Sequence, residues 1–84
     1  MSVESRKAAL IEEIQRYADN CLSQAAQCGK EISFGQEDVF LRTADTASQL
    51  VEFATKTQVE YRTVEEMYCK IRMENAALLS GAER

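Results

Sequence analysis

Apolar residues recur at helical intervals along the first third of the chain. Ser2 to Cys28 contains no glycine or proline, and successive members of one apolar row stand four, three, four, four and three residues apart. The row is Leu10, Ile14, Tyr17, Cys21, Ala25 and Cys28. This spacing places all of these side chains on one face of an α-helix. Gly29 follows the row directly, where glycine commonly ends a helix, so we predict a helix over about 3–28 and a connection over 29–36.

A longer pattern begins after the connection. Gln36 to Ser80 contains no glycine or proline, and two rows of residues repeat every seven positions. One row is Phe40, Ala47, Ala54, Tyr61, Tyr68 and Asn75, and the other is Thr43, Leu50, Thr57, Val64, Ile71 and Leu78. Rows offset by three residues have the a/d geometry of helices that pack along their length. We predict one continuous helix over about 37–79 and a frayed tail over 80–84. The alternative is a bend or break near Thr55–Gln58, where threonines lower the helix propensity.

Two such helices predict an all-α fold: a helical hairpin with a longer second helix and coiled-coil-like packing, in a single domain over 1–84. At the standard helical rise the first helix is about 39 Å long and the second about 66 Å. An antiparallel hairpin then leaves the carboxyl-terminal part of the second helix, Tyr61 to Leu79, without an intramolecular partner. That part holds the bulkiest residues of the two rows, and monomers rarely expose so large an apolar stripe. We therefore expect the hairpin to be oligomeric or partner-bound.

This hairpin divides the apolar positions into two sets. The predicted intramolecular core is Leu10, Ile14, Tyr17, Cys21, Phe40, Ala47, Leu50 and Ala54. The predicted partner interface is Tyr61, Val64, Met67, Tyr68, Ile71, Asn75, Leu78 and Leu79. Asn75 is the polar member of the second set, and it either fixes the register and number of the packed helices or is solvated near the helix end.

Composition argues against catalysis and for a shared core. The chain has 84 residues with no histidine, proline or tryptophan; eleven residues are alanine and only eighteen are Val, Ile, Leu or Phe. So few large apolar side chains make a thin core. Without histidine the chain lacks the commonest general base and metal ligand, and three glycines do not suffice for a phosphate-binding loop. We therefore predict that the protein is not an enzyme, and we predict no catalytic, cofactor-binding or metal-binding residues.

Net charge and cysteine content limit the kinds of partner and the cellular locations that we expect. A net charge of −4 is the wrong sign for neutralising the phosphates of a nucleic acid, so we expect no nucleic-acid partner. We expect instead a protein partner, which is either a second copy of this chain or another helical protein. No apolar run is long enough to span a membrane, and the amino terminus lacks the apolar block of a signal peptide. Three cysteines, an odd number, favour a reducing cytoplasmic location, with export without a cleaved signal left open. Cys21 and Cys28 are expected to be buried, whereas Cys69 has an intermolecular disulfide as its alternative role.

The layout of a short helix, a loop and a longer carboxyl-terminal helix resembles that of helical-hairpin subunits of bacterial secretion machines. These are needle-type filament subunits, their chaperones and the WXG-type exported proteins. The Trp-x-Gly turn of the last group is absent, since the loop reads Ser33-Phe34-Gly35, and so is the proline that needle subunits carry. The pattern itself predicts a noncatalytic protein–protein interaction subunit, adaptor or chaperone-like, that buries its carboxyl-terminal helix against a partner or a second copy. The alternatives are a self-assembling subunit or co-chaperone of a secretion-type machine, and an acidic inhibitor or regulator of a larger complex.

Overall fold

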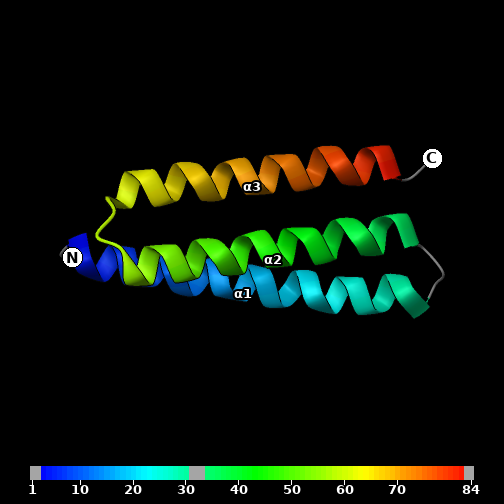
Figure 1. Ribbon diagram of the computed structural model, residues 1–84, viewed down its shortest axis with the longest axis horizontal. Coiled ribbons are helices and arrows are strands. Elements are labelled where there is room, and N and C mark those ends of the chain that lie inside the picture. Colours follow the sequence, from blue (N-terminus) through cyan, green and yellow to red (C-terminus); the bar gives the residue numbers. More distant parts are fainter. Residues whose placement is uncertain (1–2, 31–33, 83–84) are drawn as a thin grey trace.

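The computed structural model describes residues 3–30 and 34–82 and shows an all-α protein, as predicted. Helix α1 spans Val3–Lys30, α2 spans Phe34–Lys56 and α3 spans Tyr61–Ala82. Each helix runs antiparallel to the one before it, so the amino terminus and the α2–α3 joint lie at one end of the molecule (Figure 1). The result is a three-helix bundle with extents of 44 × 20 × 19 Å. None of these helices combines the length and hydrophobicity needed to cross a membrane.

The predicted two-helix hairpin is wrong, because the second helix is interrupted. Residues 57–60 are not helical, and α3 turns back along the bundle instead of extending α2. The interruption falls close to the threonine-rich stretch that was the alternative position for a break. Its physical reason is burial: the turn places Val64 and Tyr68 of α3, which a straight helix would expose, in the core. The predicted overhang of the second helix therefore does not exist in this structure.

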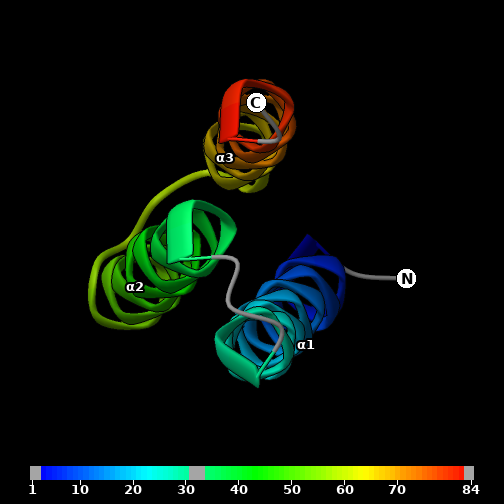
Figure 2. The ribbon, with the colours of Figure 1, turned by 90° about the vertical axis from the view of Figure 1, so that its right-hand side faces the viewer.

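Small residues allow α1 and α2 to lie close together. Ala18, Ala47 and Ala54 are each at most 3% exposed and stand where the two helices meet the core. The core cluster is Leu10, Ile14, Ala18, Ala47, Leu50, Ala54, Val64 and Tyr68. Seen end-on, the three helices occupy the corners of a triangle (Figure 2). The strongest packing is between α1 and α2, and α3 completes the core with two larger side chains.

The helix ends differ from the predicted boundaries by a few residues. Helix α1 continues through Gly29 and Lys30, so Gly29 has a helical backbone and does not end the helix. Helix α2 already contains Gly35, and α3 contains Gly81. Of the predicted connection, 31–33 lie outside the described residues, as do 83–84 of the predicted tail.

Candidate partner-binding groove

A groove runs between α2 and α3. It has a volume of about 490 Å³. Its lining is Thr46, Gln49, Leu50 and Phe53 from α2 with Met67, Lys70, Ile71 and Glu74 from α3. The α2 residues follow one another at helical spacing and so share one face of that helix. All of the lining residues come from α2 and α3, so the groove lies along the contact between these two helices.

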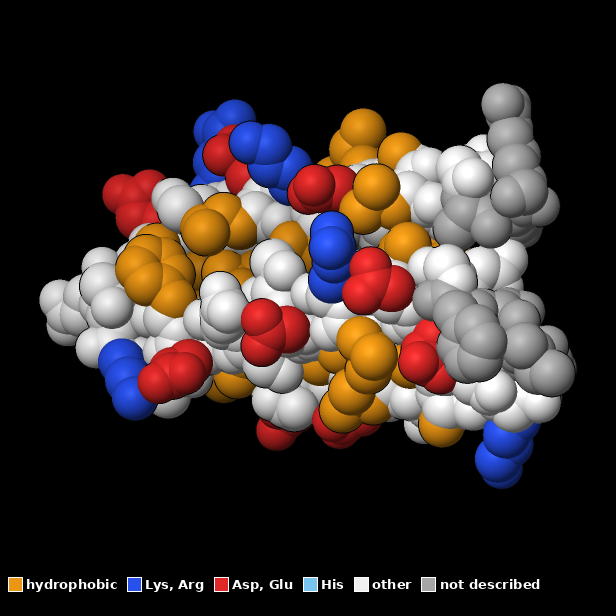
Figure 3. Space-filling view, turned by 45° about the vertical axis from the view of Figure 1, so that its right-hand side comes forward, with side chains coloured by type: hydrophobic (Ala, Val, Ile, Leu, Met, Phe, Trp, Pro, Cys, Tyr) orange, Lys and Arg blue, Asp and Glu red, His pale blue; other side chains and the backbone are white. Residues whose placement is uncertain are grey.

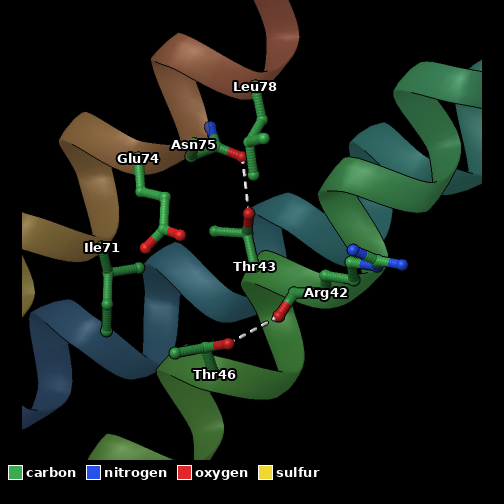
Figure 4. Close-up of a pocket in the computed structure, with 7 residues that line it drawn as sticks. All are labelled: Arg42, Thr43, Thr46, Ile71, Glu74, Asn75 and Leu78. Carbon is green, nitrogen blue, oxygen red and sulfur yellow. Dashed lines mark hydrogen bonds between the residues drawn. The ribbon is translucent and has the colours of Figure 1, made fainter. Parts of the chain in front are cut away.

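A second, smaller hollow continues the groove toward the carboxyl-terminal end of α3 (Figure 4). Its volume is about 170 Å³, and it shares Thr46, Ile71 and Glu74 with the larger one. The other lining residues are Arg42, Thr43, Asn75 and Leu78. Because the two hollows share a wall, we treat them as one surface, which we call the α2–α3 groove.

Large apolar side chains on the groove remain exposed to solvent. Phe53 is 41% exposed, Met67 40% and Leu78 45%. The other exposed large hydrophobics in the described part of the chain are Leu22, Leu41 and Met73. The space-filling view shows hydrophobic side chains gathered in clusters between acidic and basic ones (Figure 3). The groove thus joins three of these exposed residues into one concave apolar strip.

The floor of the groove is tied together by a polar contact between α2 and α3. The Thr43 hydroxyl lies 2.7 Å from Oδ1 of Asn75 and 2.8 Å from the carbonyl oxygen of Val39. With one proton, this hydroxyl donates to one of these oxygens at a time. Thr43 is buried and Asn75 is half-buried. The hydrogen bond between them fixes the register of α3 against α2, with Asn75 opposite Thr43.

Two charged residues of the groove have no ion-pair partner in the described part of the chain. These are Lys70 and Glu74, both of α3. The nearby cation Arg42, in contrast, pairs with Asp38 at 3.1 Å. The groove therefore offers one positive and one negative side chain beside its apolar strip.

The contact between α1 and α3 is aromatic. The rings of Tyr17 and Tyr68 meet edge to face, with centroids 5.5 Å apart and planes at 77°. The guanidinium of Arg6 on α1 lies 4.8 Å from the centre of the Tyr61 ring on α3. Arg72 stacks on Tyr68 at 4.6 Å, but both of these residues belong to α3. Each contact of these kinds contributes about 0.5–1.5 kcal/mol, so a small number of side chains holds α3 against α1.

Burial raises the pKa of both tyrosines of the ring pair and of the neighbouring Cys21. Desolvation, together with the neighbouring Cys21, raises the pKa of Tyr17 to about 12. The pKa of the Cys21 thiol is also raised, chiefly by desolvation, and that of Tyr68 is raised by desolvation and then by the charge of Glu13. A raised thiol pKa lowers the thiolate fraction, so Cys21 is a poor nucleophile at neutral pH.

The other two cysteines differ in their exposure to solvent. Cys28 is buried and its Sγ donates a long hydrogen bond, 3.8 Å, to Oε1 of Gln36. Cys69 is exposed on α3. Within residues 3–30 and 34–82, no three Cys, Asp or Glu side chains come together as a metal-binding group.

The structure distributes the predicted interface residues over three environments. Val64 and Tyr68 lie in the core of the chain itself. Tyr61, Ile71, Asn75 and Leu79 are half-buried, and Met67 and Leu78 are exposed. Of the predicted core residues, Leu10, Ile14, Cys21, Ala47, Leu50 and Ala54 are buried, while Tyr17 and Phe40 are half-buried.

Sequence reasoning did not assign Phe53, Gln49, Lys70 or Glu74 to any site. Phe53 stands three residues beyond Leu50 and was predicted to flank the apolar rows, but it was not assigned to the core or to the interface. The groove itself needs α3 beside α2, and the continuous helix of the prediction did not allow that arrangement.

Comparison of the chain with models of protein families, with curated proteins and with solved structures gives no match.

Proposed function

We propose that the protein is a noncatalytic adaptor that binds an amphipathic helix of a partner protein in its α2–α3 groove. The observation that carries this proposal is the concave strip in which Phe53, Met67 and Leu78 stand exposed around Leu50 and Ile71. An apolar groove between two helices is a common receptor for a third amphipathic helix. A methionine in the wall suits this role, because its unbranched thioether adapts to differently shaped side chains.

The dimensions of the groove set the length of its ligand. Thr43 to Phe53 on α2 and Met67 to Leu78 on α3 each extend about 15 Å at 1.5 Å per residue. A bound helix of about three turns fills that length. It would present apolar residues at i, i+3, i+4 and i+7 to the groove.

The exposed apolar area sets the affinity. At roughly 200 Å² for each of three large side chains, 40–45% exposure leaves about 250 Å² to cover, and a partner contributes a similar area. At about 25 cal/mol per Å² this gives about 12 kcal/mol before the cost of association, which is itself about 4–15 kcal/mol. We therefore expect a weak complex with a dissociation constant in the micromolar range or above. Lys70 and Glu74 would orient the partner rather than add much affinity, because both contact solvent.

The test uses a displayed library of amphipathic helical peptides of about fifteen residues, selected on the intact protein. The affinity of a selected peptide is measured by fluorescence anisotropy for the wild type, for Met67→Glu and for the control Met73→Glu. Both methionines belong to α3 and both are exposed, but Met73 does not line the groove. We expect Met67→Glu to weaken binding at least tenfold, since it places a charge in the apolar strip, and Met73→Glu to change it less than twofold.

Equal effects of the two substitutions would refute the groove as the binding surface. Methyl NMR gives an independent readout, since a bound peptide should shift the signals of Leu50 and Ile71 more than that of Leu22, which lies on α1. The self-assembling subunit and the acidic inhibitor have no comparable observation in their favour and stay predictions, as does the cytoplasmic location.

A further inference from the structure

The buried faces of α2 and α3 are in phase, although the two helices are separate. On α2 the buried residues include Thr43, Ala47, Leu50 and Ala54, and on α3 they include Val64 and Tyr68. Ala54 and Tyr68 are two heptads apart, as are Leu50 and Val64. If residues 57–60 became helical, both buried faces would therefore form one continuous stripe on a single helix from Phe34 to Ala82.

The joint between α2 and α3 is itself able to become helical. It consists of Thr57, Gln58, Val59 and Glu60, with no glycine or proline. Helical i to i−4 hydrogen bonds flank it on both sides: the Thr57 amide donates to the Phe53 carbonyl oxygen at 2.9 Å, and the Val64 amide donates to that of Glu60 at 3.2 Å. Three of the four side chains are exposed, so straightening the joint disturbs little of the core beyond half-buried Val59.

The contacts that hold α3 do not require that it come from the same chain. They are the Tyr17–Tyr68 ring pair, the Arg6–Tyr61 stacking, the Thr43–Asn75 hydrogen bond and the burial of Val64. Helix α3 of a second copy can make all of them. A monomer with its own α3 in place and a dimer that exchanges α3 would therefore make the same contacts. The equilibrium between them depends on the helix propensity of the joint and on protein concentration.

We propose that two copies of this chain exchange α3. The joint straightens, α2 and α3 become one helix, and α3 of each copy packs on α1 and α2 of the other. The geometry is compatible with this exchange, because α3 runs antiparallel to α2 and starts beside the end of α2 (Figure 1). Two long helices arranged antiparallel about a two-fold axis, with their joints side by side, reproduce that arrangement in each half. The α2–α3 groove is retained, since the partner's α3 replaces the chain's own, so this inference goes beyond the proposed function and stands independently of it.

The first test changes the helix propensity of the joint alone. Thr57→Ala with Gln58→Ala raises that propensity, and Thr57→Gly with Gln58→Gly lowers it. The matched control is Gln24→Ala with Thr63→Ala, the same chemical changes at exposed positions inside α1 and α3. The mass of each protein is measured by sedimentation equilibrium over a wide concentration range, with far-UV circular dichroism to confirm folding.

Two joints straighten in each dimer, so every change in propensity counts twice. We expect the alanine pair to lower the dissociation constant of the dimer roughly thirtyfold and the glycine pair to raise it roughly tenfold. The control pair should change it less than about threefold, because its residues are helical in both forms. A monomer of 9.5 kDa at every concentration for the alanine pair, or an equal shift in the control, would overturn the proposal.

The second test distinguishes exchange from association through a surface. Spin labels are attached to Cys69 and to a Ser48→Cys residue, in a background with Cys21→Ala and Cys28→Ala, and labelled chains are diluted in unlabelled ones. In the closed chain the two labelled positions lie nearly level on adjacent helices, so their separation should be below about 20 Å. In the exchanged dimer, 21 residues of continuous helix separate them by about 31 Å. A dimer that keeps the short distance would overturn the exchange.

Discussion

Val64 is the residue whose substitution tests most sharply whether α3 packs on the core. It is fully buried in the core cluster with Ile14 and Leu50, although it belongs to the helix that sequence reasoning left without an intramolecular partner. Val64→Ala removes two methyl groups, at about 0.8 kcal/mol of transfer free energy each. A residual cavity adds about 1 kcal/mol, and the better helix propensity of alanine returns about 0.5 kcal/mol. We therefore expect the free energy of unfolding to fall by about 2 kcal/mol.

That loss is large for a chain of this size, whose total stability is about 4–12 kcal/mol. Urea denaturation followed by circular dichroism at low micromolar concentration measures it, and thermal unfolding should show a decrease in Tm of about 10 °C. The matched control is Met73→Ala on the same helix, where the side chain is 69% exposed and the expected change is within about 0.5 kcal/mol. If Val64→Ala also changed the stability by less than about 0.5 kcal/mol with an unchanged m value, the packing of α3 on the core would be refuted.

Three further predictions concern the half-buried Tyr17, the cysteines and Gly29 of α1. Because burial raises the pKa of Tyr17 from 10.0 to about 12, the unfolded chain loses this proton first, so stability should fall as the pH rises from about 10 toward 12. Urea titrations across this range should show a smaller fall for Tyr17→Phe, and an identical fall would contradict the assignment. Cys69 should react with a thiol reagent at least about tenfold faster than the two buried cysteines in the folded protein, as followed by mass spectrometry. Gly29→Ala should raise the free energy of unfolding, measured by urea titration, by about 0.5 kcal/mol. The residue is helical, and the new methyl group meets only the flexible carboxylate of Glu37. A loss of stability would show that this carboxylate is fixed in place.

The α2–α3 groove could be predicted only in part. Met67, Ile71 and Leu78 belonged to the predicted interface, because their spacing put them on the apolar stripe of a helix. Lys70 and Glu74 were not assigned because charged side chains do not belong to the apolar rows, and Phe53 was left out because its segment was predicted to pack against the first helix. Their position in the groove arises from two helices meeting side by side, which no pattern within a single helix specifies.

Local patterning determined that this chain is helical and which faces of its helices are apolar. Leu10 and Ile14 on the first helix and Leu50 on the second are buried as their periodicity predicts, because a spacing of 3.6 residues is a property of the backbone alone. The path of the chain after Lys56 was decided by the tertiary structure. Straight and broken forms of residues 57–60 differ locally by small propensity terms, whereas folding α3 back buries Val64 and Tyr68 within the same chain. In a single chain, that long-range gain selects the break.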